Sequence, residues 1–243
     1  MFSFFSKKKH TETDFYFPIS TDIHSHVLPG IDDGSPDVAT SLELINGLVA
    51  LGVKKSVATP HIISDLYRNT PETIHAALQQ LQEALQQARI DFEVTAAAEY
   101  MLDEGFFSLL DAGAPLLCVK DKMILTEFSY NVRPDNPREI SFKIITEGYT
   151  PILAHPERYA YFHFNVQSYH LLQDLGFLLQ VNLLSLTGYY GAAVAKAARY
   201  IIRNRLATFT ATDLHHHNHL AALQDAANKG IFKELAEFIP TNA

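Results

Sequence analysis

The stretch TDIHSHVLPGIDDGS, residues 21–35, introduces a pattern that recurs along the chain. It begins as a short apolar run and then brings His24, His26 and Asp33 close together in sequence. His24 and His26 are two residues apart, so in a strand their side chains share one face and can hold one ion. The stretch therefore predicts a strand whose carboxyl end carries metal ligands.

Seven short apolar runs recur, with helical segments between them. They are TDIHSH, KKSVATPH, FEVTAAAEY, KMILTEF, TPILAHP, FLLQVN and ATFTATDLH. Several are rich in Val, Ile, Leu and Thr without strict alternation, which indicates strands buried on both faces of a parallel sheet. The helices carry start signals such as Ser35-Pro36 and Thr70-Pro71, and Gly52 is expected to end the first helix. The alternation predicts a closed or nearly closed α/β barrel, with an open doubly wound sheet as the alternative.

Histidine and carboxylate side chains stand at the ends of these runs or in the loops that follow. The nine candidates are His24, His26, Asp33, His61, Glu99, Glu127, His155, Asp213 and His215. The carboxyl ends of barrel strands meet at one face, where active sites of this architecture lie. Nitrogen and oxygen ligands without thiolate suit manganese, iron or zinc better than a soft metal. Nine ligands exceed the needs of one ion, so we expect two or three divalent ions, with Glu99 or another carboxylate bridging them.

Taken singly, each of these residues has an ordinary structural explanation, since a histidine at a strand end can be a hydrogen-bonded core or loop residue. Glu99 and Glu127 are more informative, because a carboxylate that closes an apolar strand is costly to bury unless it is paired or metal-bound. Asp22 and Asp32 are expected to be supporting loop groups. Asp22 could orient a histidine ligand by accepting from its free ring N–H.

Composition excludes several classes of protein. The formal net charge of −8 disfavours a nucleic-acid surface, and no stretch is long and apolar enough to span a membrane. Cys118 is the only cysteine, which excludes an internal disulfide and suits a reducing compartment. A cysteine-based phosphatase needs an arginine six residues after its nucleophile, and here that position is Ile124. We therefore interpret Cys118 as a buried apolar residue. We expect one domain over residues 1–243, with residues 1–17 as a flexible N-terminal tail.

Together these motifs resemble the PHP (polymerase and histidinol phosphatase) superfamily. The resemblance is strongest to its bacterial manganese-dependent protein tyrosine phosphatases of capsular or exopolysaccharide synthesis. Six motifs carry it in order: DIHSHVLPGIDDGS, TPH, AAEY, LTEF, AHPERY and TDLHH. They extend over residues 22–215, nearly the whole chain.

The resemblance implies a distorted (β/α)7 TIM-like barrel, the PHP fold, with a trinuclear site formed by the nine candidates. It implies manganese as the preferred ion, with iron, zinc or magnesium as alternatives. The implied activity is hydrolysis of phosphotyrosine on the tail of a bacterial tyrosine kinase in the cytoplasm. Arg158 of AHPERY would contact the phosphate as a catalytic residue, or pair with Glu157 or another carboxylate. Arg68 is the one basic residue just after the second motif and is a second substrate candidate.

The sequence departs from the family after the last motif, where DLHHHNHLAALQ offers histidines instead of an arginine. We expect His216, His217 and His219 to form a solvated helix start, with extra ligands or substrate contacts as the alternative. Two other functions stay open. One is a small-molecule phosphoesterase of the histidinol-phosphate type, and the other is a non-catalytic, metal-bound regulator of a polysaccharide assembly kinase.

Overall fold

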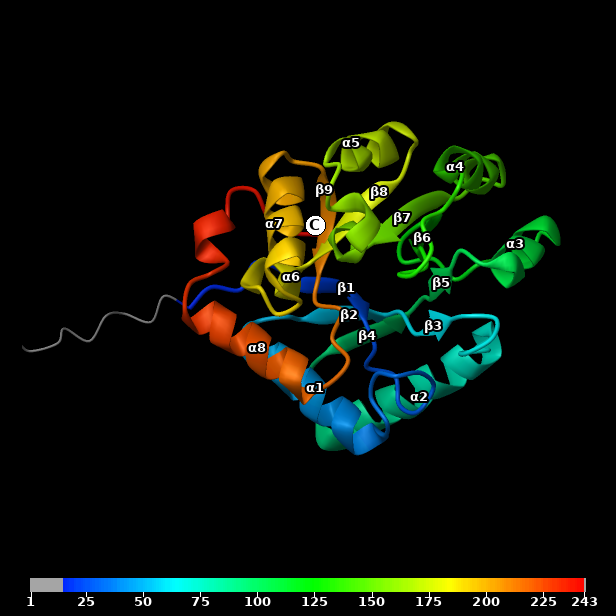
Figure 1. The fold of residues 1–243 in the computed structure, drawn as a ribbon. Helices are drawn as coiled ribbons and strands as arrows, with labels where there is room; N and C mark the ends of the chain where they lie inside the picture. The colour runs from blue at the N-terminus through cyan, green and yellow to red at the C-terminus, as the bar shows by residue number, and fades with distance from the viewer. Residues whose placement is uncertain (1–14, 243) are drawn as a thin grey trace, which may run out of the picture.

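The computed structural model describes residues 15–242 of the chain (Figure 1). Most of the predicted tail, residues 1–14, lies outside the described residues. The rest of it contacts the folded body. The Tyr16 backbone N–H donates to the Ala227 carbonyl at 3.2 Å, and the Phe17 ring packs edge-on against Phe232.

Nine strands, all paired in parallel, form two sheets in this part of the chain. The first sheet has the order β1 (Thr21–Ser25), β2 (Lys55–Ala58), β4 (Glu93–Ala96). The second has the order β3 (His61–Ile62), β5 (Glu99–Met101), β6 (Met123–Glu127), β7 (Thr150–Ala154), β8 (Leu178–Asn182), β9 (Ala207–Ala211). β3 resumes the run that begins with β2, and β5 resumes that of β4, so nine strands match the seven predicted runs. The predicted parallel α/β architecture is confirmed.

Two of the predicted strands are interrupted, which the sequence reading did not anticipate. Pro60 separates β2 from β3, and proline has no N–H to donate to a ladder. The break is shared by the neighbouring strand, where Glu99 N–H donates to the Pro60 carbonyl at 3.1 Å. His61 and Glu99 pair with each other in the resumed ladder. His61 and Glu99 therefore begin β3 and β5. The prediction that they end the second and third strands is wrong in this respect.

The two sheets are joined at β1 and β9, which lie side by side in Figure 1. Asp213 N–H donates to the His24 carbonyl at 2.9 Å, and His26 N–H donates to the Leu214 carbonyl at 2.9 Å. The buried Asp22 carboxylate supports this junction by accepting from Thr212 N–H at 3.0 Å. Burial raises the pKa of Asp22 to about 6. The expectation that Asp22 orients a histidine ring is therefore wrong, because its carboxylate accepts from Thr212, just after β9, and from the backbone N–H of His24.

Helices lie around the outside of the strands (Figure 1). They are α1 (Val38–Leu51), α2 (Pro71–Ala88), α3 (Glu104–Asp111), α4 (Pro137–Thr146), α5 (Gln167–Asp174), α6 (Leu183–Thr187), α7 (Ala192–Arg203) and α8 (His217–Asn228). Residues 15–242 also contain three short 3-10 helices, which are η1 (Pro156–Arg158), η2 (Ala160–Phe162) and η3 (Lys233–Leu235). Their inner faces and the strands share one large apolar core.

The helix start and stop signals are mostly confirmed. Thr70 caps α2 with Pro71 in its first turn, and Gly52 ends α1 in the left-handed conformation at φ 93°. α1 begins later than predicted, because Asp37 is its cap and accepts from Thr40 N–H. Ser35 is buried and donates its hydroxyl to the Asp37 carbonyl instead. Within residues 15–242, no helix combines the length and the apolar character that crossing a membrane requires.

Candidate metal centre

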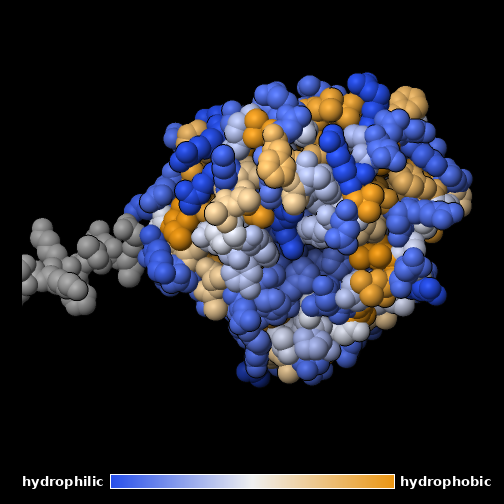
Figure 2. All heavy atoms as spheres, in the orientation of Figure 1, coloured by the Kyte–Doolittle hydropathy of each residue, from blue (hydrophilic) through white to orange (hydrophobic). Residues whose placement is uncertain are grey.

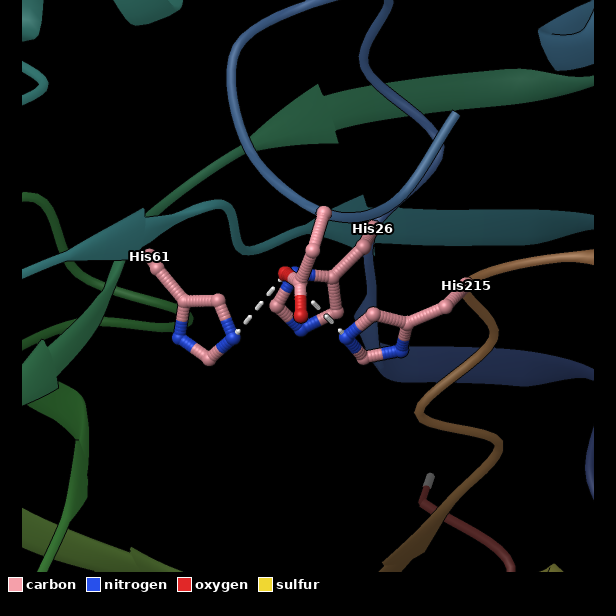
Figure 3. Close-up of side chains that lie close together, drawn as sticks. His26, His61 and His215 are labelled. Atoms are coloured by element: carbon pink, nitrogen blue, oxygen red, sulfur yellow. Dashed lines mark ion pairs between the residues drawn. The ribbon is translucent and has the colours of Figure 1, made fainter. Parts of the chain in front are cut away.

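The nine candidate ligands meet on one side of the strands. His24 lies in β1, His26 follows it, and His61 begins β3. Figure 3 shows His26, His61 and His215 turned toward one point. The dashed lines there mark ion pairs of Asp33, whose Oδ1 lies 3.5 Å from His61 Nε2 and 3.7 Å from His215 Nε2. The space-filling view has a hydrophilic hollow at its centre, where β1 ends in Figure 1 (Figure 2).

These side chains form four overlapping groups, in each of which the potential ligand atoms lie within 4.8 Å of one another. The groups are His26, Asp33, His61 and His215; His24, His26 and Asp213; His24, Glu99 and His155; and His61, Glu99 and Glu127. All nine candidates belong to at least one group, and Glu99 belongs to two. The arrangement thus has room for more than one ion, with Glu99 able to serve two of them.

Several atoms in these groups are buried without a hydrogen-bond partner. His61 Nδ1 and Glu127 Oε1 lie 3.1 Å apart, yet neither makes a hydrogen bond, and Asp213 Oδ1 has none either. Leaving such groups unpaired is costly in a folded protein. Two ligands of one ion lie close together, but each points at the ion and not at the other ligand. The placement of His61 Nδ1 and Glu127 Oε1 matches this arrangement. The donor set, all nitrogen and oxygen, fits a divalent transition metal.

The histidines and carboxylates of the centre shift one another's pKa values. Burial opposes a charge on His24, but the carboxylates of Glu99 and Asp213 raise its pKa to about 10. Burial likewise opposes a charge on Glu99, while His24 and His61 lower its pKa well below the usual range. The lowered pKa keeps the Glu99 carboxylate ionised, which is the state that binds a cation.

Two of the nine residues adopt a backbone conformation that is rare outside glycine. His155 has φ 36° and Asp213 has φ 51°, both in the left-handed region. Such conformations cost about 1–3 kcal/mol each and cluster at functional sites. They occur here where β7 and β9 have just ended.

Two histidines are oriented through their second ring nitrogen. His26 Nδ1 lies 2.7 Å from Asp32 Oδ2, so Asp32 has the predicted supporting position. His24 Nδ1 lies 2.8 Å from Gln180 Oε1, and Gln180 in turn contacts Asn182. The sequence reading missed these two amides, because FLLQVN ends without a charged residue. The available signal was two amides, two residues apart, in a strand that is otherwise apolar.

A cavity of about 240 Å³ opens over the ligands. It also reaches Arg158, whose guanidinium carbon lies 4.4 Å from the centre of the Tyr190 ring and 5.0 Å from that of Tyr130. Arg158 Nη1 lies 2.9 Å from Asp213 Oδ2. The predicted alternative partner, Glu157, is buried elsewhere and accepts from Ser185 Oγ at 2.6 Å. Arg158 is therefore at the cavity and paired with a candidate ligand.

Other predicted residues lie apart from the cavity. Arg68 donates from Nε to the Ser64 carbonyl in its own loop, and it does not line the cavity. Cys118 is half-buried against the core, outside the cavity, and burial raises the pKa of its thiol.

The three histidines after the last motif have different surroundings. His217 is exposed beside Glu43, as a solvated helix start predicts. His216 is exposed and caps α8, but it also lines the cavity. His219 is buried and lines the cavity, with Nδ1 3.2 Å from the Asp213 carbonyl oxygen. His219 therefore departs from that prediction.

Comparison with known proteins agrees with the geometry. The family model described as "Capsular polysaccharide synthesis, CpsB/CapC" matches residues 20–237. The tyrosine-protein phosphatase YwqE of Bacillus subtilis is 31% identical over 195 residues, which cover 80% of this chain and 76% of YwqE. The tyrosine-protein phosphatase CpsB of Streptococcus pneumoniae is 28% identical over 201 residues, covering 80% of this chain and 82% of CpsB.

A solved structure reported in a study of YwqE and CpsB superposes with a TM-score of 0.76 at 26% identity, covering 91% of this chain and 96% of that one. The study describes these two proteins as metal-dependent tyrosine phosphatases.

Proposed function

Because the chain belongs to the CpsB/CapC family of capsular polysaccharide synthesis, we propose that it is a metal-dependent protein tyrosine phosphatase. The observation that carries the proposal is the meeting of nine nitrogen and oxygen side chains beside one cavity that also reaches Arg158. Phosphomonoester hydrolysis requires an activated water and positive charge that stabilises the phosphoryl group, and a metal centre next to a fixed cation can supply both. We also propose that the chain forms a single PHP domain, since both sheets contribute to this centre.

We propose that two or three divalent ions occupy the centre, manganese by preference and iron, zinc or magnesium as alternatives. The nine candidate residues would hold them, with Glu99 shared between two ions. When bound, such ions would offset the four carboxylates of the centre, polarise the phosphate and make water acidic enough to attack near neutral pH.

Arg158 has the role of binding a phosphate oxygen. Its guanidinium presents planar donors that match phosphate, and the flanking Tyr130 and Tyr190 rings keep it facing the cavity. A phenol has a pKa of about 10, so a tyrosyl leaving group needs less protonation than an alkyl alcohol would. A contact from Arg68 stays a prediction, because its guanidinium is held in its own loop.

The substrate we propose is phosphotyrosine on the tail of a tyrosine kinase that governs polysaccharide assembly. We propose that the reaction takes place in the cytoplasm, where the phosphatase would meet the tail of such a kinase. Fractionation of cells that produce the chain would test this location, and recovery with secreted material would contradict it.

The decisive experiment compares turnover of a phosphotyrosine peptide with turnover of histidinol phosphate. We expect manganese-loaded protein to favour the peptide and to lose activity on chelation. Preference for histidinol phosphate would point to a small-molecule phosphoesterase. No hydrolysis of either, with retained kinase binding, would point to a regulator. His155→Ala should abolish dephosphorylation while leaving kinase binding intact.

A further inference from the structure

A chain of buried side-chain hydrogen bonds runs behind the candidate metal centre. His24 Nδ1 lies 2.8 Å from Gln180 Oε1, and Gln180 Nε2 donates to Asn182 Oδ1 at 2.8 Å. Asn182 Nδ2 then donates to Asp213 Oδ2 at 2.6 Å, and Arg158 Nη1 reaches the same oxygen at 2.9 Å. Gln180 and Asn182 are fully buried, so water does not compete for these bonds.

The chemistry of the chain permits only one direction. An ionised carboxylate can only accept, so Asn182 must turn its amide nitrogen toward Asp213. Its oxygen then faces Gln180, which must donate from its own nitrogen and leave its oxygen for His24. His24 must therefore carry a proton on Nδ1, whatever the charge of the ring. The charge on Asp213 thus sets the proton position on His24 through two amides.

The remaining side-chain atom of each end faces the same group. His24 Nε2 lies 3.2 Å from Asp213 Oδ1 and 3.1 Å from both His26 Nε2 and Glu99 Oε2. His24 and Asp213 belong to the candidate group completed by His26. The two amides occupy the other donor or acceptor atom of each residue, which is His24 Nδ1 and Asp213 Oδ2. His24 is consequently limited to Nε2 as a ligand atom, and Asp213 Oδ1 is kept free of hydrogen bonds.

We propose that Gln180 and Asn182 are positioning residues that align His24 and Asp213 as a matched pair of ligands for one cation. This inference rests on the metal centre of the proposed function. Groups that orient metal ligands in this way typically contribute about 10–100-fold to metal affinity. Because Arg158 shares Asp213 Oδ2 with Asn182, the same chain links the ion group to the proposed phosphate contact.

The test is a titration of metal-free protein with Mn²⁺, in which free Mn²⁺ is followed by electron paramagnetic resonance. The variants are Gln180→Met and Asn182→Leu, which keep side-chain volume and remove the amides. Each should weaken one bound equivalent by about 10–100-fold and leave the others unchanged. Circular dichroism and thermal unfolding check the fold, and if one variant fails to fold the other decides the outcome.

Two controls separate alignment from a general loss of stability. Thr210 lies in β9, next to the strand that carries the two amides, and Thr210→Val removes a buried hydroxyl that donates to the Pro240 carbonyl, outside the chain of amides. It should keep wild-type Mn²⁺ affinity. The double variant of Gln180 and Asn182 should lose no more affinity than either single one, because both act through one chain.

Wild-type affinity in both single variants would overturn the inference, as would an equal loss in Thr210→Val. Additive losses in the double variant would also overturn it. These outcomes leave the proposed function standing, provided that the wild-type protein hydrolyses the phosphotyrosine peptide with Mn²⁺. A wild-type chain that binds neither Mn²⁺ nor iron, zinc or magnesium would overturn both.

Discussion

Tyr190 should control how firmly Arg158 is held for phosphate. The Arg158 guanidinium carbon lies 4.4 Å from the centre of the Tyr190 ring, closer than the 5.0 Å to Tyr130. The Arg158 side chain is 25% exposed, so the contact is largely shielded from water. A cation over an aromatic face contributes about 0.5–1 kcal/mol when exposed and about 2 kcal/mol when desolvated. Tyr190→Leu should therefore cost about 1–2 kcal/mol, a fall of about 5–30-fold in kcat/KM.

Steady-state hydrolysis of a phosphotyrosine peptide would measure this effect. We expect KM to rise more than kcat falls, because Arg158 contacts the phosphate both before and during reaction. Tyr190→Phe is the matched control, since it keeps the ring and removes a hydroxyl that lies 3.5 Å from His219 Nε2. Tyr189→Leu is a second control on the neighbouring residue, which does not line the cavity. Both controls should stay near wild type.

The reasoning would be refuted if Tyr190→Phe lost as much kcat/KM as Tyr190→Leu, because the ring face would then not be what matters. Because the Tyr189 ring packs edge-on against Tyr190, an equal loss in Tyr189→Leu would show that the packing of this loop, and not the contact with Arg158 alone, is responsible. Unchanged kinetics in Tyr190→Leu would exclude a role for the ring altogether.

Three further changes have defined outcomes. Mn²⁺ at about 100 times its Kd should stabilise the fold by about 2.7 kcal/mol per site and raise Tm by about 5–11 °C in a thermal shift assay, whereas no shift relative to EDTA would count against the metal centre. Glu99→Gln removes the carboxylate common to two ligand groups, so mass spectrometry under native conditions should find less bound manganese, and full loading would contradict the bridging role. Cys118→Ala should keep kcat/KM within about twofold, because the thiol lies outside the cavity and does not act as the nucleophile. A large loss of turnover in this variant would instead support a cysteine nucleophile.

Much of the candidate site was predictable because most of its ligands stand at or after the carboxyl ends of strands, whereas His61 and Glu99 begin β3 and β5. A histidine or carboxylate directly after an apolar run marks the carboxyl end of a parallel strand, and those ends meet on one face in this architecture. Local signals likewise located Thr70 as the cap of α2 and Gly52 as the end of α1. α3 and α6, which the sequence reading passed over, are among the shorter helices and offer less periodicity to detect.

The sequence by itself therefore determined the alternation of strands and helices, the family and the set of residues that meet at the centre. Only the tertiary structure decided their partners, because a hydrogen bond across the fold leaves no mark on local spacing. Asp22 meets Thr212 across 190 positions, and His24 meets Gln180 across 156. Amides such as Gln180 carry no charge that would draw attention in a strand. Their role depends on which atoms face them, and that is a property of the folded chain.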